Sequence, residues 1–270
     1  MPYRLLALDL DGTLLRSDQR VDDDDVAAIA ELQAAGVTVT IATGRLQSGA
    51  LGAARACAIE GVIACCEGSH LVELATNTTV HHHPMGAPTI SLLRSTIGSH
   101  DLASFVFDAQ GIHHDHAGAP YAGYVSTWSP NLRVVEEELA WQTLPLATIS
   151  IGDEASIRAA ATTLAAHADQ LFSVSFAVSA YPGKHALLVR TAGPTKGTAL
   201  RELCAMTGCT VEEAVCVGDW VNDIPMFEVA GRSFAMGAAP EAVRAKATDV
   251  LTAQAGAGGG IAEAIRRAWG

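Results

Sequence analysis

A short apolar run that ends in two carboxylates most constrains how this chain can fold. Residues 5–15 read Leu-Leu-Ala-Leu-Asp-Leu-Asp-Gly-Thr-Leu-Leu. The apolar start is typical of a parallel strand that is buried on both faces. Asp9 and Asp11 follow in the i, i+2 relation, so on an extended chain their side chains point to one side while Leu10 points away. Gly12 permits a tight turn directly after them.

Two carboxylates at the end of a strand repel each other unless a proton or a cation separates them. The carboxyl ends of the strands in an open α/β sheet are also where ligands bind. Asp9 and Asp11 therefore indicate a metal site. The alternative is that both are ordinary turn-forming acids, a role that Asp-Gly-Thr after a strand would also fill.

A second predicted strand ends in groups that can hold a phosphate. The β-branched run at 37–42 predicts this strand, and Thr43, Gly44 and Arg45 follow it. A hydroxyl, a flexible backbone and a guanidinium suit phosphate oxygens through hydrogen bonds and charge. Thr43 also suits the N-cap of the next helix, and the two roles are compatible.

Two further element ends carry polar groups. Lys196 opens a predicted helix, where a parallel sheet would bring a loop to the tip of the first strand. The residues before Lys196 lack the glycine spacing of a P-loop, so nucleotide binding of that kind is not supported. A predicted strand at 214–218 ends in Asp219, Asn222 and Asp223, which make a second acidic strand tip.

The order of the predicted elements indicates an α/β fold, with a Rossmann-like parallel-sheet core and an inserted α+β cap domain. Strands and helices alternate up to a third strand at 61–66, as in a parallel sheet with crossover helices. From about His81 helices mix with hairpins, one of them across 109–111. We therefore expect a discontinuous core of residues 1–80 and 188–270 and a cap of residues 81–187.

Two clusters of titratable side chains have simpler explanations than a metal site. Asp22 to Asp25 precede a predicted helix, where the helix dipole favours negative charge, and we expect a solvated helix start. Histidines cluster at 81–83 and at 113–116. Adjacent histidines on a strand point to opposite faces and cannot all converge on one metal ion, so we expect surface histidines or contacts to a bound substrate.

Composition limits the partners of the chain. The formal net charge is -12, with 29 acidic residues against 17 lysines and arginines. Nucleic-acid and membrane-surface binding need basic patches, so we expect neither partner. No window of about 18 apolar residues occurs, and the N-terminus lacks the layout of a signal peptide. The six cysteines show no Cys-x-x-Cys spacing, so we expect buried free thiols in a reduced, cytoplasmic protein.

Four ordered motifs together resemble the haloacid dehalogenase-like hydrolase superfamily, and within it the Cof-type phosphatases, which carry a large α/β cap between the second and third motifs. The matching residues are Asp9-Leu10-Asp11-Gly12-Thr13, Thr43-Gly44-Arg45, Lys196-Gly197 and Gly218-Asp219-Trp220-Val221-Asn222-Asp223. The match is collinear and spans the chain, including Met236-Gly237-Ala238 and residues 259–265. Four motifs in order are far more specific than one, and they argue against a turn-only role for the first two acids.

The resemblance implies a role for each motif. Asp9 would be the nucleophile that receives the phosphoryl group as an aspartyl-phosphate, and Asp11 the acid/base that protonates the leaving alcohol and later deprotonates water. Thr43 and Lys196 would assist catalysis by binding the transferring phosphoryl group. The implied cofactor is Mg²⁺. Its ligands would be Asp9, Asp219, Asp11 through its backbone carbonyl, and Asp223 either directly or as a supporting acid.

The resemblance says less about substrate recognition. The implied substrate-binding residues are Thr43, Gly44, Arg45, Lys196 and Asn222. The family often has Asn-Gly after the third strand, where this chain has Glu67 and Gly68. Other candidate contacts are Arg45, His113, Tyr121 and His185, for which ordinary surface or packing roles are favoured.

The implied function is Mg²⁺-dependent hydrolysis of small phosphorylated metabolites, such as sugar phosphates, by a monomer or homodimer. The cap would close over the site, exclude water and select the leaving group. Two alternatives stay open. A phosphosugar mutase would use the same Asp9 but return the phosphoryl group to its substrate, and a non-catalytic sensor would bind phosphorylated metabolites without turnover.

Overall fold

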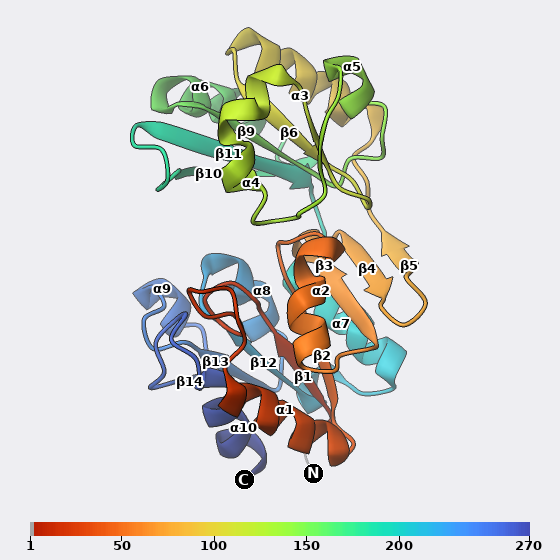
Figure 1. The fold of residues 1–270 in the computed structure, drawn as a ribbon, viewed down its shortest axis with the longest axis vertical. Helices are drawn as coiled ribbons and strands as arrows, with labels where there is room; N and C mark the ends of the chain where they lie inside the picture. The colour runs from red at the N-terminus through yellow and green to blue at the C-terminus, as the bar shows by residue number, and fades with distance from the viewer. Residues whose placement is uncertain (1–2) are drawn as a thin grey trace. The chain divides into compact units, whose positions relative to one another are not determined.

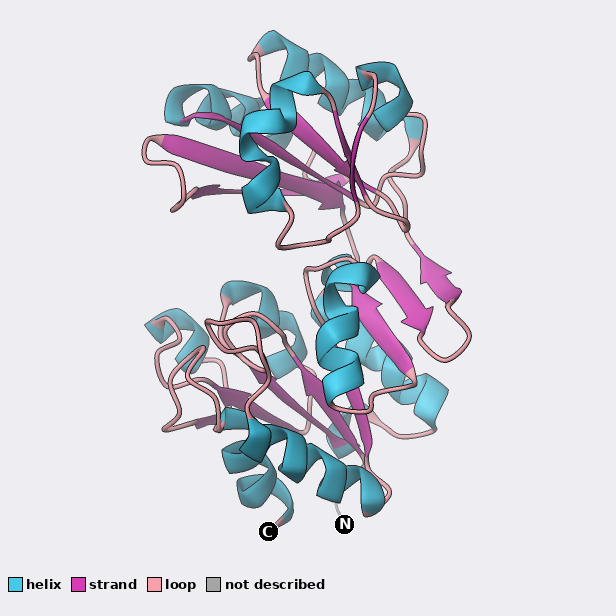
Figure 2. Cartoon of the chain, in the orientation of Figure 1, coloured by secondary structure: helices cyan, strands magenta, loops and turns pink. Residues whose placement is uncertain are grey.

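The computed structural model describes residues 3–270, which divide into two compact units (Figure 1). The first unit comprises the residues up to 44, 50–81 and 194–270, and the second comprises 45–49 and 82–193. Each unit combines strands and helices (Figure 2). We predicted the inserted segment as 81–187. Strand β11 (Lys184–Thr191) lies in the second unit over its whole length, so this unit extends to Gly193.

The first unit is built on a five-stranded parallel sheet in the order β14-β13-β12-β1-β2. Its strands are β1 (Leu5–Leu8), β2 (Thr38–Ile41), β12 (Ala214–Gly218), β13 (Arg232–Ala235) and β14 (Asp249–Val250). Every residue of β1 and β12 is buried, as their unbroken apolar sequences predict for strands covered on both faces. The predicted parallel-sheet core is confirmed.

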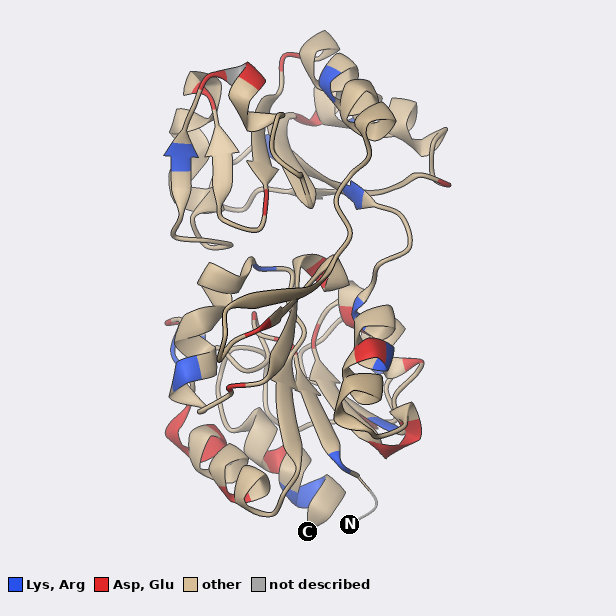
Figure 3. Cartoon of the chain, turned by 90° about the vertical axis from the view of Figure 1, so that its right-hand side faces the viewer, with Lys and Arg blue, Asp and Glu red and all other residues tan. Residues whose placement is uncertain are grey.

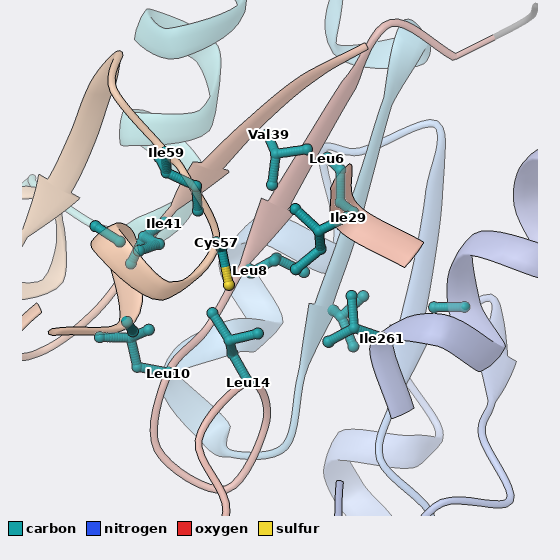
Figure 4. Close-up of a cluster of buried hydrophobic side chains, with 14 of the residues drawn as sticks. Leu6, Leu8, Leu10, Leu14, Ile29, Val39, Ile41, Cys57, Ile59 and Ile261 are labelled. Carbon is teal, nitrogen blue, oxygen red and sulfur yellow. The ribbon is translucent and has the colours of Figure 1, made fainter. Parts of the chain in front are cut away.

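Helices supply the apolar cover on both faces of this sheet. Helices α1 (Asp23–Ala34) and α10 (Gly260–Trp269) pack together, and the cluster in Figure 4 joins Ile29 and Ile261 from these helices to Leu6 of β1. Leu5, the residue before Leu6, packs with Leu200 in a second apolar cluster. The other helices with residues in this unit are α2 (Gln47–Ala56), α7 (Lys196–Thr207), α8 (Ile224–Phe227) and α9 (Glu241–Arg244).

The strand predicted at 61–66 meets the parallel sheet through one parallel bridge but pairs mainly in another sheet. It is β3 (Val62–Cys65), which forms a separate three-stranded sheet with two unpredicted strands, β4 (His70–Glu73) and β5 (Thr78–His82). β3 and β4 are antiparallel, and an isolated bridge between Ala42 and Ala64 links β3 to the end of β2. The chain reverses after β3 because Cys66 and Glu67 take left-handed backbone conformations, with φ of 48° and 59°.

The second unit contains a six-stranded sheet in the order β10-β11-β9-β6-β7-β8, which is antiparallel except for the pair β7 and β8. Its remaining strands are β6 (Ala103–Phe107), β7 (Ile112–His114), β8 (Leu132–Val134), β9 (Ala147–Asp153) and β10 (Leu171–Ala177). Its helices are α3 (Ala87–Ser99), α4 (Ala122–Val125), α5 (Glu137–Ala140) and α6 (Glu154–Ala165). Side chains of α3 and α6 form an apolar core with Val106 and Leu187. The predicted hairpin across 109–111 is confirmed.

The expectation of surface histidines is wrong for His113 and His114, which are buried. β7 lies between β6 and β8 in the sheet, so both edges of this strand are covered. His113 Nε2 lies 2.9 Å from Asp108 Oδ2, and the ring of His114 packs against Phe105. Both histidines therefore have structural partners inside the second unit.

The expectation of a solvated helix start is wrong for one of the acids before α1. Asp22 caps the helix by accepting a hydrogen bond from the Asp24 N–H at 3.1 Å. Asp25, by contrast, is fully buried and accepts hydrogen bonds from the N–H groups of Gly259 and Ala262 at 3.0 and 2.8 Å. It satisfies donors at the start of α10, where the first N–H groups have no acceptor within the helix.

Two expectations about the environment of the chain can be compared with the structure. All six cysteines are buried free thiols, as predicted. Burial raises the pKa of Cys57 to about 11 and that of Cys65 to about 12. Among residues 3–270, no helix combines the length and apolar character that crossing a membrane requires.

Candidate active site

The carboxyl ends of β1 and β12 bring three carboxylates together. The two strands are neighbours, and the Asp9 N–H extends their pairing by donating to the Val217 carbonyl at 3.0 Å. Asp219 directly follows β12, and Asp223 ends the short 3-10 helix Val221–Asp223. Carboxylate oxygens of Asp9, Asp219 and Asp223 lie within 4.8 Å of one another. Two strand tips that are far apart in the sequence thus form one acidic cluster.

A fully buried lysine contacts this cluster. Lys196 is 0% exposed, and its Nζ donates to Asp9 Oδ1 at 2.5 Å and to Asp223 Oδ1 at 2.6 Å. It is the first residue of α7, whose N-cap Thr195 accepts a hydrogen bond from the Thr198 N–H. A buried ammonium without partners would be costly, so the two ion pairs determine where this side chain points.

Asp223 organises the loop after β12. Its Oδ1 accepts from Lys196, and its Oδ2 accepts from the N–H groups of Asp219 and Trp220, each at 2.9 Å. Gly218 leaves room for this carboxylate, because a Cβ there would lie 2.4 Å from Asp223 Cγ. Both oxygens are already engaged, which favours a supporting role for Asp223 over direct metal ligation.

The turn after β1 holds the Asp219 carboxylate in place. Gly12 has a φ of 82°, and a Cβ at this position would lie 2.4 Å from Asp219 Oδ2. Glycine is therefore required both by the backbone conformation and by the space. Thr13 donates from Oγ1 to Asp219 Oδ1 at 3.1 Å.

Asp11 lies in a different environment from Asp9. β1 ends at Leu8 and the chain turns, with the Thr13 N–H donating to the Leu10 carbonyl at 3.2 Å. Strand alternation therefore does not extend to Asp11, which is exposed and whose carboxylate is not among the three that cluster. An exposed carboxyl group can exchange protons with solvent and ligand, as an acid/base role requires. The metal contact expected of its backbone carbonyl stays a prediction.

Burial and repulsion from neighbouring carboxylates raise the pKa values of Asp9 and Asp219. Burial is the main reason why the pKa of Asp9 lies well above its ordinary value, and the charges of Asp223 and Asp219 add to this while Lys196 opposes it. Burial and the charge of Asp223 raise the pKa of Asp219 to about 6. Burial lowers the pKa of Lys196, but Asp223 and Asp9 outweigh it, so this pKa lies above its ordinary value. Lys196 is therefore charged at neutral pH.

The donor set suits a hard divalent cation. Three carboxylates lie together and Lys196 supplies one positive charge, which leaves negative charge in excess. A divalent cation would offset this excess and favour the ionised forms of Asp9 and Asp219. Carboxylate oxygens are the ligands that Mg²⁺ prefers. Asp9 and Asp219 are the best placed to hold it, because hydrogen bonds already engage both oxygens of Asp223.

The tip of β2 is connected to a residue that the sequence analysis did not select, Glu67. Thr43 is buried, and its carbonyl accepts a hydrogen bond from the Glu67 N–H at 3.0 Å. Glu67 Oε1 accepts from Asn222 Nδ2 at 2.8 Å, and a Cβ on Gly44 would lie 2.5 Å from the same oxygen. Glu67 thus joins the second motif to the fourth. The one signal for Glu67 in the sequence was that this chain has Glu67-Gly68 where the family often has Asn-Gly.

The remaining candidate substrate contacts belong to the second unit. The Arg45 guanidinium donates to the Gly49 carbonyl at 3.3 Å. Tyr121 packs edge-on against Tyr181, with ring centroids 5.1 Å apart. These contacts agree with packing roles, whereas the buried Nδ1 of His185 has no hydrogen-bond partner among the described residues. Substrate contact by Arg45 stays a prediction.

The carboxylates and the buried lysine lie at the carboxyl ends of parallel strands, where open α/β sheets bind ligands, and the lysine can stabilise negative charge there. The sequence profile of the haloacid dehalogenase-like hydrolases matches residues 6–265. The chain belongs to this family. Relatives named as phosphatases support the enzyme class of phosphoric monoester hydrolases.

Relatives and solved structures cover nearly the whole chain. The pyridoxal phosphate phosphatase YbhA of Escherichia coli is 27% identical over 269 residues, which are 93% of this chain and 94% of that protein. An HMP-PP phosphatase of Yersinia pseudotuberculosis is 25% identical over 87% of this chain and 84% of its own. A haloacid dehalogenase-like hydrolase from Bacteroides thetaiotaomicron has a TM-score of 0.85 at 24% identity, covering 98% and 99% of the two chains. A subclass IIB sugar phosphatase has a TM-score of 0.80 at 19% identity, covering 98% of each chain. The two structures show that the fold is shared.

Proposed function

We propose that this protein is a Mg²⁺-dependent phosphatase that hydrolyses small phosphorylated metabolites through an aspartyl-phosphate on Asp9. The observation that carries the proposal is the contact of the buried Lys196 ammonium with Asp9, beside the carboxylate of Asp219. Such a lysine offsets negative charge at the nucleophile and on the transferring phosphoryl group. If Asp9 were only a turn residue and Lys196 only a solvated charge, these two side chains would not need to be buried in contact with each other.

Asp9 would act as the nucleophile. One of its carboxylate oxygens attacks phosphorus, and the bond from phosphorus to the substrate oxygen breaks, so that this oxygen leaves with the electron pair. Asp11 donates the proton that makes the leaving group an alcohol. Asp11 then takes a proton from water, whose oxygen attacks the same phosphorus. The bond between Asp9 and phosphorus breaks, inorganic phosphate leaves, and both carboxyl groups return to their starting states.

Asp9 and Asp219 would hold Mg²⁺, together with the Asp11 backbone carbonyl and, directly or as support, Asp223. When bound, the cation supplies positive charge that favours ionised Asp9 and neutralises phosphate oxygens. Thr13 contributes by holding the carboxylate of Asp219 through its hydroxyl.

Thr43, Gly44, Arg45, Lys196 and Asn222 would bind the substrate. The Asn222 side chain is held on one side, because its Nδ2 donates to Glu67, while its buried Oδ1 has no hydrogen-bond partner among residues 3–270. An unsatisfied buried acceptor is costly, so a donor from water or from a substrate hydroxyl would be favourable there.

The second unit would act as the cap that excludes water and selects the leaving group, as the family resemblance implies. Two of the relatives are named for pyridoxal phosphate and HMP-PP, and a structural neighbour is named a sugar phosphatase. Small compounds of these kinds are the first substrates to test. The buried cysteines, which form no disulfide among the described residues, agree with our further proposal of a cytoplasmic location.

Phosphate release from a panel of phosphorylated metabolites, with and without Mg²⁺, tests this function. We expect metal-dependent release by the wild type and at least about a 1000-fold loss in Asp9→Asn, which keeps the size of the side chain but removes the nucleophile. The matched control is Asp23→Asn, an equal change of charge at an exposed position, which should keep wild-type turnover. Undiminished release by Asp9→Asn would contradict the proposal.

Product analysis separates the alternatives. A phosphosugar mutase would yield an isomeric sugar phosphate with little free phosphate, and a sensor would bind metabolites without either product. We expect stoichiometric alcohol and inorganic phosphate.

A further inference from the structure

Strand β10 is an outer strand of the sheet in the second unit, and it has no charged residue. Its seven residues read Leu-Phe-Ser-Val-Ser-Phe-Ala and include neither proline nor glycine. The opposite edge of the same sheet, β8, has three residues, one of which is Arg133. The outer strand β14 of the parallel sheet has two residues. Proteins usually protect sheet edges by shortness, charge or proline, and β10 uses none of these.

The hydrogen-bonding groups on the outer side of β10 can be assigned from its pairing with β11. The Ala192 N–H donates to the Gln170 carbonyl, and the Val178 N–H donates to the Lys184 carbonyl. In an antiparallel ladder the bonded residues alternate, so the even-numbered residues of β10 bond to β11. The backbone N–H and C=O groups of Ser173, Ser175 and Ala177 therefore point away from the sheet. The C=O of Leu171 does so too, whereas its N–H donates to the His167 carbonyl at 3.0 Å.

The sequence of β10 reads almost the same in both directions around Val174. Phe172 corresponds to Phe176, and Ser173 corresponds to Ser175. We propose that β10 pairs antiparallel with β10 of a second copy of this chain, around a two-fold axis at Val174. Two-fold interfaces require a surface that is complementary to itself, and this strand has that property both in sequence and in backbone pattern.

The outward-pointing groups match this register. Ser173 lies opposite the partner's Ser175, so these residues form hydrogen-bonded pairs on both sides of the axis. Leu171 lies opposite the partner's Ala177, and there the Leu171 carbonyl accepts from the partner strand, because the Leu171 N–H already donates to His167. Val174 faces its own copy as a non-hydrogen-bonded pair, in which side chains approach more closely. Phe172 faces the partner's Phe176, an aromatic pair of the kind that stabilises neighbouring strands.

The exposed side chains of β10 form an apolar strip along the proposed interface. Phe172 is 43% and Val174 is 36% exposed, and both lie on the same face of the strand with Phe176. The Arg190 guanidinium lies 4.3 Å from the centre of the Phe172 ring and supports it from β11. A second β10 would continue the strip without bringing charged side chains of the strand into opposition.

Charge and area predict how strong the dimer is. Each chain has a net charge of -12, so two copies repel at long range, and salt screens this repulsion. Seven paired residues bury less than the about 800 Å² per partner of a standard stable interface. We therefore expect a weak dimer that forms at higher protein concentration and that 0.15 M salt favours over 0.01 M salt.

Sedimentation velocity across protein concentration tests the proposal. We expect a monomer–dimer equilibrium in the wild type and at least a tenfold weaker dimer in Val174→Lys, which places like charges opposite each other at the axis. Ser175→Pro should also weaken the dimer, because it removes an outward N–H that β11 does not use. The matched control is Val134→Lys, the same change at an exposed residue of the opposite edge strand, and it should leave the dimer unchanged. Circular dichroism verifies that each variant is folded.

Cysteine crosslinking tests the register. Val174→Cys should form a disulfide-linked dimer under mild oxidation, since a non-hydrogen-bonded pair brings the two Cα atoms to about 4.5 Å, within the range of disulfides. Val134→Cys should not crosslink, and the native cysteines are buried and do not compete. A wild type that is monomeric at every concentration and salt would overturn the proposal. A dimer that persists in Val174→Lys, or larger open assemblies that disappear with it, would overturn the two-fold pairing.

Discussion

Lys196 supplies positive charge to the group of carboxylates in the site. Its ammonium is fully buried between Asp9 and Asp223, and it is the positive group in direct contact with both. Without it, two buried carboxylates would face each other with nothing to offset their charge. Lys196 is the first residue of α7, so the start of this helix places the charge beside the strand tips.

We predict that Lys196→Met lowers turnover at least about 100-fold, because charge stabilisation of the phosphoryl group is lost. Breaking a buried ion pair should also destabilise the metal-free protein by about 3–5 kcal/mol. Mg²⁺ should restore part of that stability, since it offsets the same carboxylates. Phosphate release and thermal unfolding with and without Mg²⁺ measure both effects. Lys246→Met, at an exposed ion pair, is the control, and turnover of Lys196→Met within about threefold of the wild type would contradict the assignment.

Glu67 offers a test of a positioning residue. Its Oε1 accepts the hydrogen bond of Asn222, so Glu67→Gln keeps an acceptor while Glu67→Ala leaves the amide without one. An unsatisfied buried group costs about 1–3 kcal/mol, so we predict a KM about tenfold higher in Glu67→Ala and close to the wild type in Glu67→Gln. Steady-state kinetics of the three proteins distinguish this from a role of the charge itself, which both variants would lose equally.

The site could be predicted from the sequence where strand tips carry its residues. Asp9, Asp219 and Asp223 follow apolar runs, and adjacent parallel strands bring such tips together. Glu67 could not be selected in this way. It meets Asn222 across 155 positions of sequence, and that contact depends on the reversal of the chain after β3.

At the scale of elements, α1 and α10 show how one side chain can join two helices. Asp25 lies in the first turn of α1 and accepts two hydrogen bonds from the start of α10. Burial raises its pKa despite these bonds. The Asp25 carboxylate therefore caps α10, while its burial disfavours the ionised form.

We predict that Asp25→Ala destabilises the protein by about 1–3 kcal/mol, because two N–H groups lose their acceptor. The pH dependence has a definite sign. A carboxyl group whose native pKa is raised binds its proton more tightly in the folded state, so its contribution to stability is complete below its ordinary value of 3.8 and declines as pH rises through the native value. The stability of the wild type minus that of Asp25→Asn should therefore fall between pH 4 and pH 7. Urea unfolding measures this difference, and a rise with pH would contradict the environment described for Asp25.

The sequence predicted elements with a strong period and missed short polar ones. The apolar run of β12 was predicted at its observed bounds. The hairpin of β4 and β5 has polar side chains in both strands and was not predicted, because its pairing depends on tertiary contacts. The pairing of β3 with β4 was not predicted for a related reason. An apolar run alone does not say which sheet a strand joins.

On the scale of the whole molecule, the net charge of the chain is negative, which is also the sign of a phosphorylated substrate. Acidic residues outnumber basic ones by 29 to 17, and residues of both kinds occur in each unit (Figure 3). An anionic substrate therefore meets an unfavourable field at long range and depends on local cations. In the proposed mechanism these local cations are Lys196 and a bound divalent metal ion.

The reactivity of the buried cysteines shows whether the whole chain is folded. All six are buried, and burial raises the pKa of Cys65 to about 12, so little thiolate is present at pH 8. We predict slow reaction of the native protein with a thiol-specific reagent and complete reaction of six thiols in denaturant. Ser91→Cys introduces an exposed thiol as a control and should react at once. Rapid reaction of the native wild type would contradict the burial of these side chains.

The covalent intermediate on Asp9 is the central claim, and chemical trapping tests it most directly. The wild type is quenched during turnover of its best substrate with Mg²⁺, and borohydride reduces any aspartyl-phosphate to homoserine, which peptide mass spectrometry can locate. We predict homoserine at position 9 and unmodified aspartate at position 11. Sustained turnover without homoserine at position 9, or homoserine at position 11 instead, would contradict this mechanism.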